Sequence, residues 1–366
     1  MKITRVRTQT ITRRSARPER NPRVVWREKS VLLVAIETDD GEVGIGEAWC
    51  DGGSPAVTAH LIEADFAPLL IGQDPRFFAR IWQRIADTTI YSIRDGIAFA
   101  ALSGIDIAIW DLLGKRYGVC VSTLLGGTRD RVFAYASGGL YAEDKTASDL
   151  GREMLGYVER GFRGVKLKIG GAAFREDVAR VAAAREAIGP DVRLMVDAVY
   201  MLSVADAIRM SRALERYDVY FLEAPVHPAN VEGLADVARS SPLPLAGNEF
   251  AYGRSQFKRL LDARAVEFIH LDTIVCGGIT EATHIASLAY AYGRPCSYHA
   301  ASSAVCFAAN LHVAAATPNC DSIEYHMIHQ VLWDQLPSGL FALDADGHVV
   351  VPDAPGLGLS AELMAG

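Results

Sequence analysis

The chain of 366 residues is 50% hydrophobic and 22% charged, a composition that excludes a disordered protein and is typical of a folded globular one. Its formal net charge of -7 gives no general attraction for nucleic acid or anionic lipid, so the expected partners are small molecules. A barrel of alternating strands and helices takes about 250 residues, which leaves enough chain for a second domain.

The six cysteines show no CxxC spacing, which argues against a zinc knuckle or a disulfide framework and favours reduced, mostly buried thiols. No continuous apolar stretch follows the basic N-terminus, so a signal peptide is not expected. No apolar run approaches the length of a membrane span, so no membrane partner is expected either. These features predict a cytoplasmic protein.

Residues 1–126 are expected to form an N-terminal α+β capping domain. Two strand-like stretches, 31–38 and 42–49, flank an Asp-Gly turn and are predicted to form a hairpin. Helical stretches follow at 55–71, 75–87 and 95–117, and in the last of these apolar residues recur at helical spacing.

The segment from Arg5 to Lys29 contains eight arginines in an otherwise acidic chain. One interpretation is a solvated loop between an N-terminal strand and the hairpin. The other is a mobile flap whose guanidinium groups enclose an anionic substrate, with Arg17 and Arg20 as candidate substrate contacts. A nucleic-acid-binding arm is not expected, because no basic fold follows the segment.

Residues 127–330 alternate between strand and helix and are predicted to form the barrel. The alternation begins with a strand at 132–136 and includes helices such as 173–188 and 203–216. Residues 331–366 contain turn signals and short strand-like stretches, and we expect this segment to return to the capping domain.

Seven ionisable residues recur along the barrel region at intervals of 23 to 29 residues, roughly the length of one strand and one helix. They are Lys168, Asp197, Glu223, Glu249, Asp272, His299 and Glu324. Most of them end or closely follow an apolar run. Since the C-terminal ends of barrel strands converge on the face where active sites lie, the spacing predicts one polar site there.

Three of these residues are carboxylates at consecutive strand ends, namely Asp197, Glu223 and Glu249. Unpaired carboxylates brought together repel one another and raise each other's pKa unless a cation lies between them. A site with only oxygen ligands favours Mg²⁺, or Mn²⁺, over Zn²⁺. A single carboxylate is more often exposed or part of a salt bridge. The metal site is predicted because all three carboxylates stand at equivalent positions, at the ends of consecutive strands.

Lys166 and Lys168 lie two residues apart in a strand-like stretch, so their side chains share one face. If that face is the barrel interior, each lysine lowers the pKa of the other, which makes one of them a candidate base near neutral pH. The alternative is a pair of lysines on the exposed side of an edge strand.

Asp272 and His299 stand at consecutive strand ends, where an aspartate can fix the imidazole tautomer and support its protonated form. The other eight histidines, including His326 and His329, are interpreted as structural. Glu324 is predicted between the His299 strand and the first strand, where a protonated carboxyl can donate a hydrogen bond to a substrate oxygen that gains charge.

This set of groups fits abstraction of the proton next to a carboxylate, which creates an enediolate that a metal and a hydrogen-bond donor must stabilise. If the second acid/base group re-protonates that intermediate, the product is the other stereoisomer. If the same group protonates a β-hydroxyl, water leaves.

With these motifs the chain resembles the enolase superfamily and, within it, the mandelate racemase subgroup of the mandelate racemase/muconate lactonizing enzyme family. The resemblance extends over the capping domain, residues 102–112, the Lys166-Leu167-Lys168 motif, the three carboxylates, the Asp272 and His299 pair, and residues 355–358. Asp272 stands where the muconate lactonizing relatives have a lysine.

The resemblance implies an α/β fold, a modified TIM (β/α)7β barrel under an N-terminal α+β capping domain that closes over the site. It implies one Mg²⁺ bound by Asp197, Glu223 and Glu249, with Lys168 and His299 as the acid/base pair and Asp272 orienting His299. It also implies that Lys166 tunes Lys168 and helps hold the substrate carboxylate, that Glu324 is an electrophilic donor, and that the chain forms a homo-oligomer, from dimer to octamer.

Many relatives dehydrate sugar acids, so we expect a sugar-acid dehydratase, with a racemase or epimerase of a 2-hydroxy acid as one alternative and a barrel that binds a metabolite without converting it as another. The candidate substrate contacts are Lys166, Glu324, Arg17, Arg20, Tyr135 and Ser137. The stretch after His299, residues 300–303, matches no substrate motif.

Overall fold

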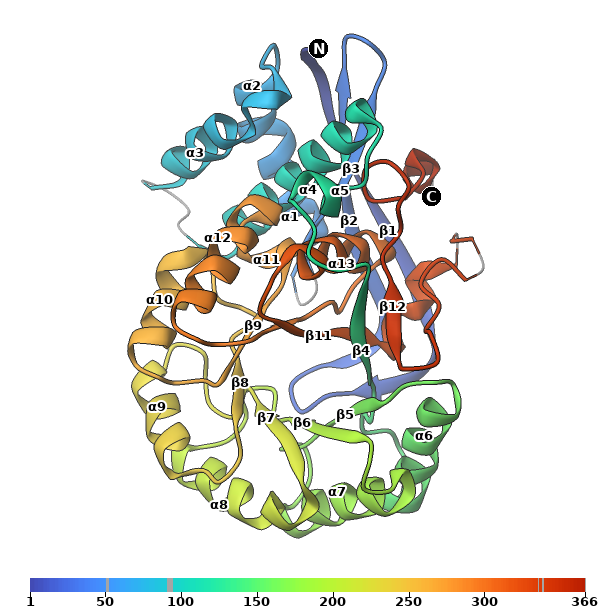
Figure 1. Ribbon diagram of the computed structural model, residues 1–366, viewed down its shortest axis with the longest axis vertical. Coiled ribbons are helices and arrows are strands. Elements are labelled where there is room, and N and C mark those ends of the chain that lie inside the picture. Colours follow the sequence, from blue (N-terminus) through green and yellow to red (C-terminus); the bar gives the residue numbers. More distant parts are fainter. Residues whose placement is uncertain (51–52, 91–94, 335, 338, 366) are drawn as a thin grey trace.

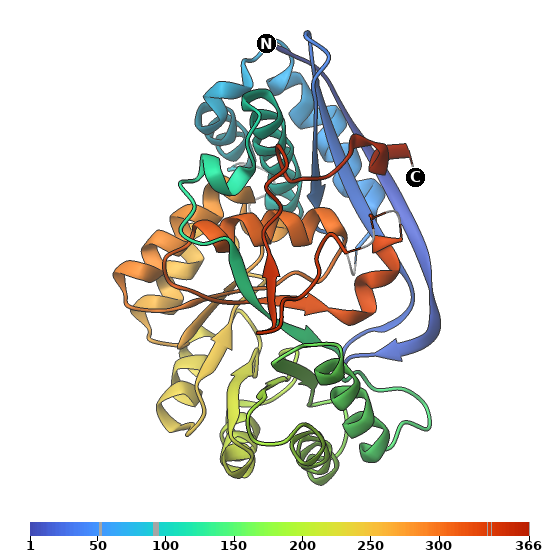
Figure 2. The same cartoon turned by 45° about the vertical axis from the view of Figure 1, so that its right-hand side comes forward.

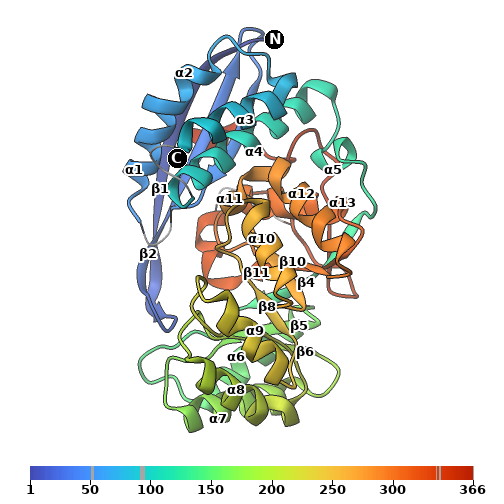
Figure 3. The ribbon, with the colours of Figure 1, turned by 90° about the vertical axis from the view of Figure 1, so that its left-hand side faces the viewer.

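The computed structural model describes residues 1–50, 53–90, 95–334, 336–337 and 339–365. An antiparallel sheet with helices forms one end of the molecule, and a barrel of parallel strands forms the other (Figure 1 and Figure 3). The α/β barrel with a separate N-terminal α+β part is the fold expected from the sequence.

The N-terminal sheet has the order β1-β2-β3, with β1 at Ile3–Arg20, β2 at Val25–Thr38 and β3 at Val43–Ala48. The predicted hairpin is β2 and β3, and its turn closes with Gly41 N–H donating to Thr38 O at 3.0 Å, with φ +85° at Gly41.

The segment from Arg5 to Lys29 is mainly strand, so both the loop and the flap interpretation misjudged its conformation. β1 pairs with β2 from Ile3 to Arg20, with a register shift between Arg14 and Glu19. Only residues 21–24 form the turn between the two strands. Figure 2 shows this long hairpin passing along one side of the molecule to the green part of the barrel.

Helices cover one face of the N-terminal sheet (Figure 3). They are α1 (Pro55–His60), a π-helical segment (Leu61–Phe66), α2 (Ala67–Leu70), a 3-10 turn (Pro75–Phe77), α3 (Phe78–Thr89), α4 (Ile97–Tyr117) and α5 (Val121–Leu124). These helices account for the three helical stretches predicted at 55–71, 75–87 and 95–117. The close approach of α4 to β3 requires Gly46, because a Cβ there would lie 2.1 Å from Gly104 O.

Helix α4 is long and apolar enough, by length and composition, to cross a membrane, which the sequence reading did not anticipate. However, 89% of its most apolar window is buried inside the protein. It packs between the N-terminal sheet and the barrel helix α12 (Gly278–Ala291), where Asp106 accepts hydrogen bonds from Thr280 N–H and Oγ1 at 2.8 and 2.6 Å.

Eight parallel strands, β4 to β11, form the barrel, which closes where β11 pairs with β4. The strands are β4 (Arg131–Ser137), β5 (Gly164–Lys168), β6 (Arg193–Asp197), β7 (Val219–Glu223), β8 (Leu245–Gly247), β9 (Phe268–Leu271), β10 (Cys296–Tyr298) and β11 (Cys320–His326). The helices between them are α6 (Ala147–Glu159), α7 (Phe174–Ile188), α8 (Val204–Leu214) with a 3-10 turn (Glu215–Tyr217), α9 (Val231–Ser240), α10 (Gly253–Asp262), α11 (Thr273–Cys276) with α12, and α13 (Ala304–Ala316).

Alternation along the strands divides the barrel interior into two layers. Tyr135, Met195, Phe221, Ala246 and Phe268 form a buried apolar cluster. In β6 and β7 the residue two positions further on is a carboxylate on the same face. The apolar layer therefore supports a polar layer at the C-terminal ends of the strands.

The last segment contacts both parts of the molecule, beginning with Asp334, which pairs with Arg13 of β1 at 2.8 Å. After a 3-10 segment (Met327–Trp333), β12 (His348–Val350) pairs antiparallel with β4. Gly356 O then accepts from Val121 N–H at 2.9 Å, and Leu357 N–H donates to Asp111 Oδ1 at 2.8 Å. A final 3-10 turn spans Ala361–Ala365. No disulfide joins the cysteines of the described chain, and all of them but Cys320 are buried.

Candidate active site

The C-terminal ends of the barrel strands bring the predicted polar residues together. Lys166 Nζ lies 2.5 Å from Glu223 Oε2 and 2.9 Å from Glu324 Oε1, while Lys168 Nζ lies 2.5 Å from Asp197 Oδ2. Both lysines are buried and face the barrel interior, so the alternative of an exposed edge strand is wrong.

The sequence predicted that one of the two lysines is neutral near pH 7, but the charges around them favour the protonated form of both. Burial lowers the pKa of Lys166, but the carboxylates of Glu223 and Glu324 outweigh it and raise the pKa well above its ordinary value. Burial likewise lowers the pKa of Lys168, and Asp197 raises it overall. The sequence revealed the like charges of the two lysines but not the opposite charge that lies closer to each of them.

The three carboxylates predicted to bind a metal are each at most 5% exposed. Burial and the nearby Glu223 raise the pKa of Glu249, whose Oε2 has no hydrogen-bond partner among the described residues. Burial also raises the pKa of Glu223, but His270 and Lys166 outweigh it and lower the pKa overall. A buried, unpaired carboxylate oxygen beside a second carboxylate is the arrangement that a divalent cation stabilises, so the residues fit a hard metal ion.

Asp197 is oriented differently from the other two carboxylates. Its Oδ2 faces Lys168, and its Oδ1 accepts from Val199 N–H at 2.8 Å. Among the residues that the structure describes, the possible ligand atoms that lie within 4.8 Å of one another belong to Glu223, Glu249 and His270, so Asp197 of the predicted set is not in this group.

His270 is a residue that the sequence reading missed. Its Nδ1 lies 3.2 Å from Glu223 Oε1, and its Nε2 lies 3.3 Å from Tyr135 Oη. The signal was present in His270-Leu271-Asp272, because strand alternation places His270 on the same face as Asp272.

Asp272 and His299 form a buried pair, with His299 Nδ1 2.7 Å from Asp272 Oδ2. Asp272 Oδ1 also accepts from Asn310 Nδ2 at 2.8 Å and from Ile274 N–H at 3.1 Å. Burial lowers the pKa of His299, but Glu324 and the hydrogen bond with Asp272 outweigh it and raise the pKa to about 9. The imidazole is therefore held as a protonated acid near neutral pH.

Glu324 lies on β11 between β10 and β4, as expected, and its Oε2 is 3.7 Å from His299 Nε2. Burial raises its pKa, but the cations Lys166 and His299 outweigh burial and hold the pKa well below its ordinary value. The neutral carboxyl predicted from the sequence is therefore not the form that these neighbours favour.

A cavity of about 160 Å³ opens onto four of the predicted site residues, which are Lys168, Asp197, Glu249 and His299. Its lining residues are Asn21, Arg23, Val24, Trp26, Trp49, Lys168, Asp197, Val199, Tyr200, Glu249, Phe250, His299, Ala301, His326 and His329. The hairpin between β1 and β2 thus covers the cavity. Arg23 fixes the hairpin tip, because its Nε and Nη2 donate to Val199 O and Tyr200 O at 2.7 and 2.5 Å.

The proposed substrate contacts have different positions. Arg20 donates to Gly171 O at 3.3 Å and stacks on Tyr141, so it anchors the hairpin outside the cavity lining. The side chain of Arg17 lies outside the described residues. Tyr135 and Ser137 are fully buried, and neither they nor Lys166 and Glu324 belong to the cavity lining.

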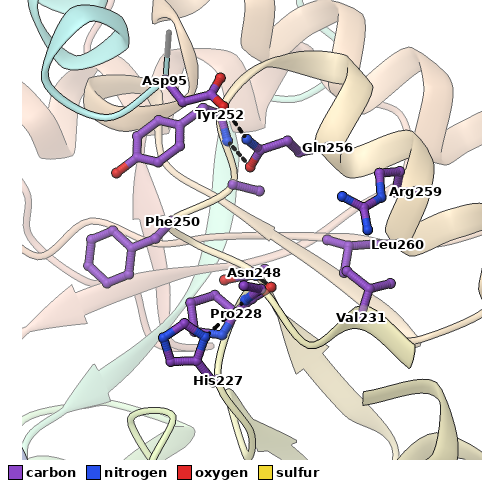
Figure 4. Close-up of a pocket in the computed structure, with 12 residues that line it drawn as sticks. Asp95, His227, Pro228, Val231, Asn248, Phe250, Tyr252, Gln256, Arg259 and Leu260 are labelled. Carbon is purple, nitrogen blue, oxygen red and sulfur yellow. Dashed lines mark hydrogen bonds between the residues drawn. The ribbon is translucent and has the colours of Figure 1, made fainter. Parts of the chain in front are cut away.

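Figure 4 shows a second cavity, of about 330 Å³, which shares the lining residue Phe250 with the first. Its polar groups mostly bond to one another and to the chain around them. Gln256 Nε2 donates to Asp95 Oδ2 at 3.1 Å, and Asn248 Nδ2 donates to Pro228 O at 3.3 Å. Lys168 and His299 line the smaller cavity and not this second one.

Comparison with known proteins assigns each part of the chain to a family. Residues 3–126 match the family described as "Mandelate racemase / muconate lactonizing enzyme, N-terminal domain". Residues 149–364 match "Enolase C-terminal domain-like".

Similar proteins cover almost the whole chain. An arabinonate dehydratase of Saccharolobus solfataricus is 38% identical over 90% of this chain and 87% of its own length, and a D-galactarolactone cycloisomerase of Agrobacterium fabrum is 37% identical over 98% and 96%. The crystal structure of a racemase from Streptomyces coelicolor A3(2) with bound magnesium superposes with a TM-score of 0.89 at 30% identity, covering 98% of this chain and 97% of that one. The chain therefore belongs to the mandelate racemase/muconate lactonizing enzyme family of the enolase superfamily.

Proposed function

We propose that this protein is a Mg²⁺-dependent dehydratase that converts a sugar acid of the aldonate or aldarate type into a 2-keto-3-deoxy acid. The observation that carries the proposal is one small cavity lined by Lys168, by His299 of the Asp272 pair, and by two of the three buried carboxylates. The similarity to an arabinonate dehydratase supports the substrate class.

Asp197, Glu223 and Glu249 are the residues that would hold the ion, with His270 beside Glu223. When bound, a divalent cation offsets the carboxylate charge that keeps Lys168 protonated and stabilises negative charge that develops on the substrate carboxylate. Mn²⁺ is the alternative ion, because it also prefers oxygen ligands.

Lys168 in its neutral form removes the proton from the carbon next to the substrate carboxylate, and Lys166, buried outside the cavity lining, adds positive charge to the site. His299, protonated and hydrogen-bonded to Asp272, donates its Nε2 proton to the β-hydroxyl as the carbon-oxygen bond breaks. Water leaves, and the remaining enol takes a proton at C3 to become the 2-keto-3-deoxy acid. The hairpin tip and the aromatic rings of Trp26, Trp49 and Phe250 restrict access of bulk water.

Incubation with a set of sugar acids and Mg²⁺, scored for keto-acid product, tests the proposal. Lys168→Ala and His299→Asn are expected to lose the product. Lys258→Ala, an exposed lysine paired with Asp262, and His348→Asn on β12 are the matched controls that should keep it. If the wild-type protein forms no keto acid from any sugar acid, the dehydratase proposal fails.

Racemisation is the second candidate, because two acid/base groups on different strands, Lys168 on β5 and His299 on β10, can each exchange a proton with the same carbon. Exchange of the α-proton in D2O without keto acid would favour it. A barrel that only binds a metabolite would show neither exchange nor product. The buried free thiols of Cys276, Cys296 and Cys306 support a reducing, cytoplasmic location. The family resemblance supports a homo-oligomer, which light scattering measures.

A further inference from the structure

Glu47 is a buried carboxylate of the N-terminal sheet that the mechanism above does not use. It lies near the end of β3, is 0% exposed, and reaches across to the barrel. Its two oxygens accept hydrogen bonds from the hydroxyls of Ser302 and Ser303, and Oε2 also accepts from Cys306 N–H at 3.0 Å. The donors all belong to residues 302–306, directly after His299.

These contacts place Glu47 at the N-terminus of α13, a helix of 13 residues. Ser303 is the N-cap and accepts from Val305 N–H at 3.1 Å, while Cys306 occupies the third helical position. In a capping box the acidic residue comes from that third position of the same helix. Here a carboxylate from the N-terminal sheet bonds the free N–H group and meets the positive end of the helix dipole.

The same helix supports both members of the His299–Asp272 pair. Asn310, further along α13, donates to Asp272 Oδ1 at 2.8 Å and accepts from Thr273 N–H at 3.0 Å. His299 is joined to the helix by residues 300–303, all of them buried. The end of β3 makes one more contact, because Trp49 N–H donates to Ile274 O at 3.2 Å.

We propose that Glu47 is a positioning residue for the His299–Asp272 pair, through which the N-terminal sheet holds the first turn of α13 and the loop that carries the imidazole. This inference rests on the proposed acid/base function of His299. It also gives a function to residues 302 and 303, which match no substrate motif.

A matched control separates positioning from stability. Asp106 on α4 is likewise buried, likewise accepts hydrogen bonds from the barrel part, through Thr280, and contacts neither α13 nor residues 300–303 in the hydrogen bonds of the described chain. Glu47→Gln replaces one acceptor oxygen with an NH2 group that cannot accept from Ser303, Ser302 or Cys306 N–H. Asp106→Asn makes the same chemical change at the other contact.

The test combines histidine NMR with kinetics. In protein labelled with ¹⁵N-histidine, with His299 assigned by loss of its signal in His299→Asn, Glu47→Gln should shift the His299 ring signals and lower the pKa of that imidazole, whereas Asp106→Asn should leave both unchanged. With a turned-over sugar acid, Glu47→Gln should lower kcat about 100-fold with little change in KM, as expected for a misplaced catalytic group. Glu47→Asp, which keeps the carboxyl group, should recover part of the loss.

If Glu47→Gln and Asp106→Asn lower Tm alike and both leave the His299 signals and kcat unchanged, Glu47 only stabilises the contact and the inference is wrong. If Glu47→Gln does not fold, Ser302→Ala removes a single donor and should show a smaller change of the same kind; unchanged His299 signals there would also overturn the inference. The NMR measurement needs no turnover, so failure of the dehydratase proposal is recognised separately, by absence of keto acid from the wild-type protein.

Discussion

His299 links the stability of the metal-free protein to pH. Burial lowers the pKa of this imidazole, but Glu324 and Asp272 raise it overall from 6.5 to about 9. At about 1.36 kcal/mol per unit, the difference corresponds to about 3 kcal/mol of unfolding free energy. Because the folded state binds the proton more tightly, this stabilisation is complete below pH 6.5 and is lost as pH rises through about 9.

Urea unfolding of the wild-type protein and of His299→Asn, with chelator present and at constant ionic strength, measures this contribution. The wild-type advantage should shrink by about 3 kcal/mol between about pH 6 and about pH 9.5. Burial raises the pKa of Glu47 and of Asp106 to about 7, so these groups also make stability depend on pH. Subtracting the unfolding free energy of His299→Asn from that of the wild type removes their contributions. A difference that stays constant over this range would refute the reasoning.

The remaining predictions concern the carboxylates, the hairpin tip and two glycines. Mg²⁺ added to chelated protein should raise its stability, by about 2.7 kcal/mol at 100 times the Kd, and Glu249→Gln should abolish the rise in a thermal melt. Arg23→Ala removes the bonds that fix the hairpin tip and should raise KM more than it lowers kcat in a steady-state assay. Gly46→Ala places a Cβ 2.1 Å from Gly104 O and should cost about 1–3 kcal/mol in urea unfolding, whereas Gly156→Ala, in the middle of α6 with open space around it, should stabilise the protein by about 0.5–1 kcal/mol.

The spacing of ionisable residues predicted the barrel and the residues at its mouth because one strand and one helix use a nearly fixed length of chain. Asp272 and His299 follow adjacent strands, so sequence order alone places them within contact range. Five of the seven residues lie at or next to the C-terminal end of their strand, Glu249 lies two residues beyond the end of β8, and Glu324 lies inside the last strand.

The charge states of those residues were not predictable from the sequence. Lys166 and Lys168 are two residues apart, so their repulsion is evident, but the 2.5 Å contacts with Glu223 and Asp197 depend on how neighbouring strands align. The contact of 2.9 Å between Lys166 and Glu324 likewise reverses the prediction that the Glu324 carboxyl is neutral. His270 was interpreted as structural, because only Asp272 of the same strand end was assigned chemistry.

The long hairpin escaped prediction for a different reason. Its first strand, β1, is rich in arginine and partly exposed, so it lacks the apolar alternation by which strands are recognised. It is a strand because β2 provides hydrogen-bond partners along most of its length. The pairing of β1 with β2 brings residues 21–26 to the cavity, although they are far from the barrel in sequence.

The roles of Lys168 and His299 are best measured by a proton NMR time course in D2O with one turned-over sugar acid and Mg²⁺. We expect the signals of a 2-keto-3-deoxy acid with the wild-type protein, and neither product nor α-proton exchange when Lys168→Ala and His299→Asn are combined. Product or exchange at the wild-type rate in that double variant would contradict the assignment of Lys168 and His299 as the groups that move protons.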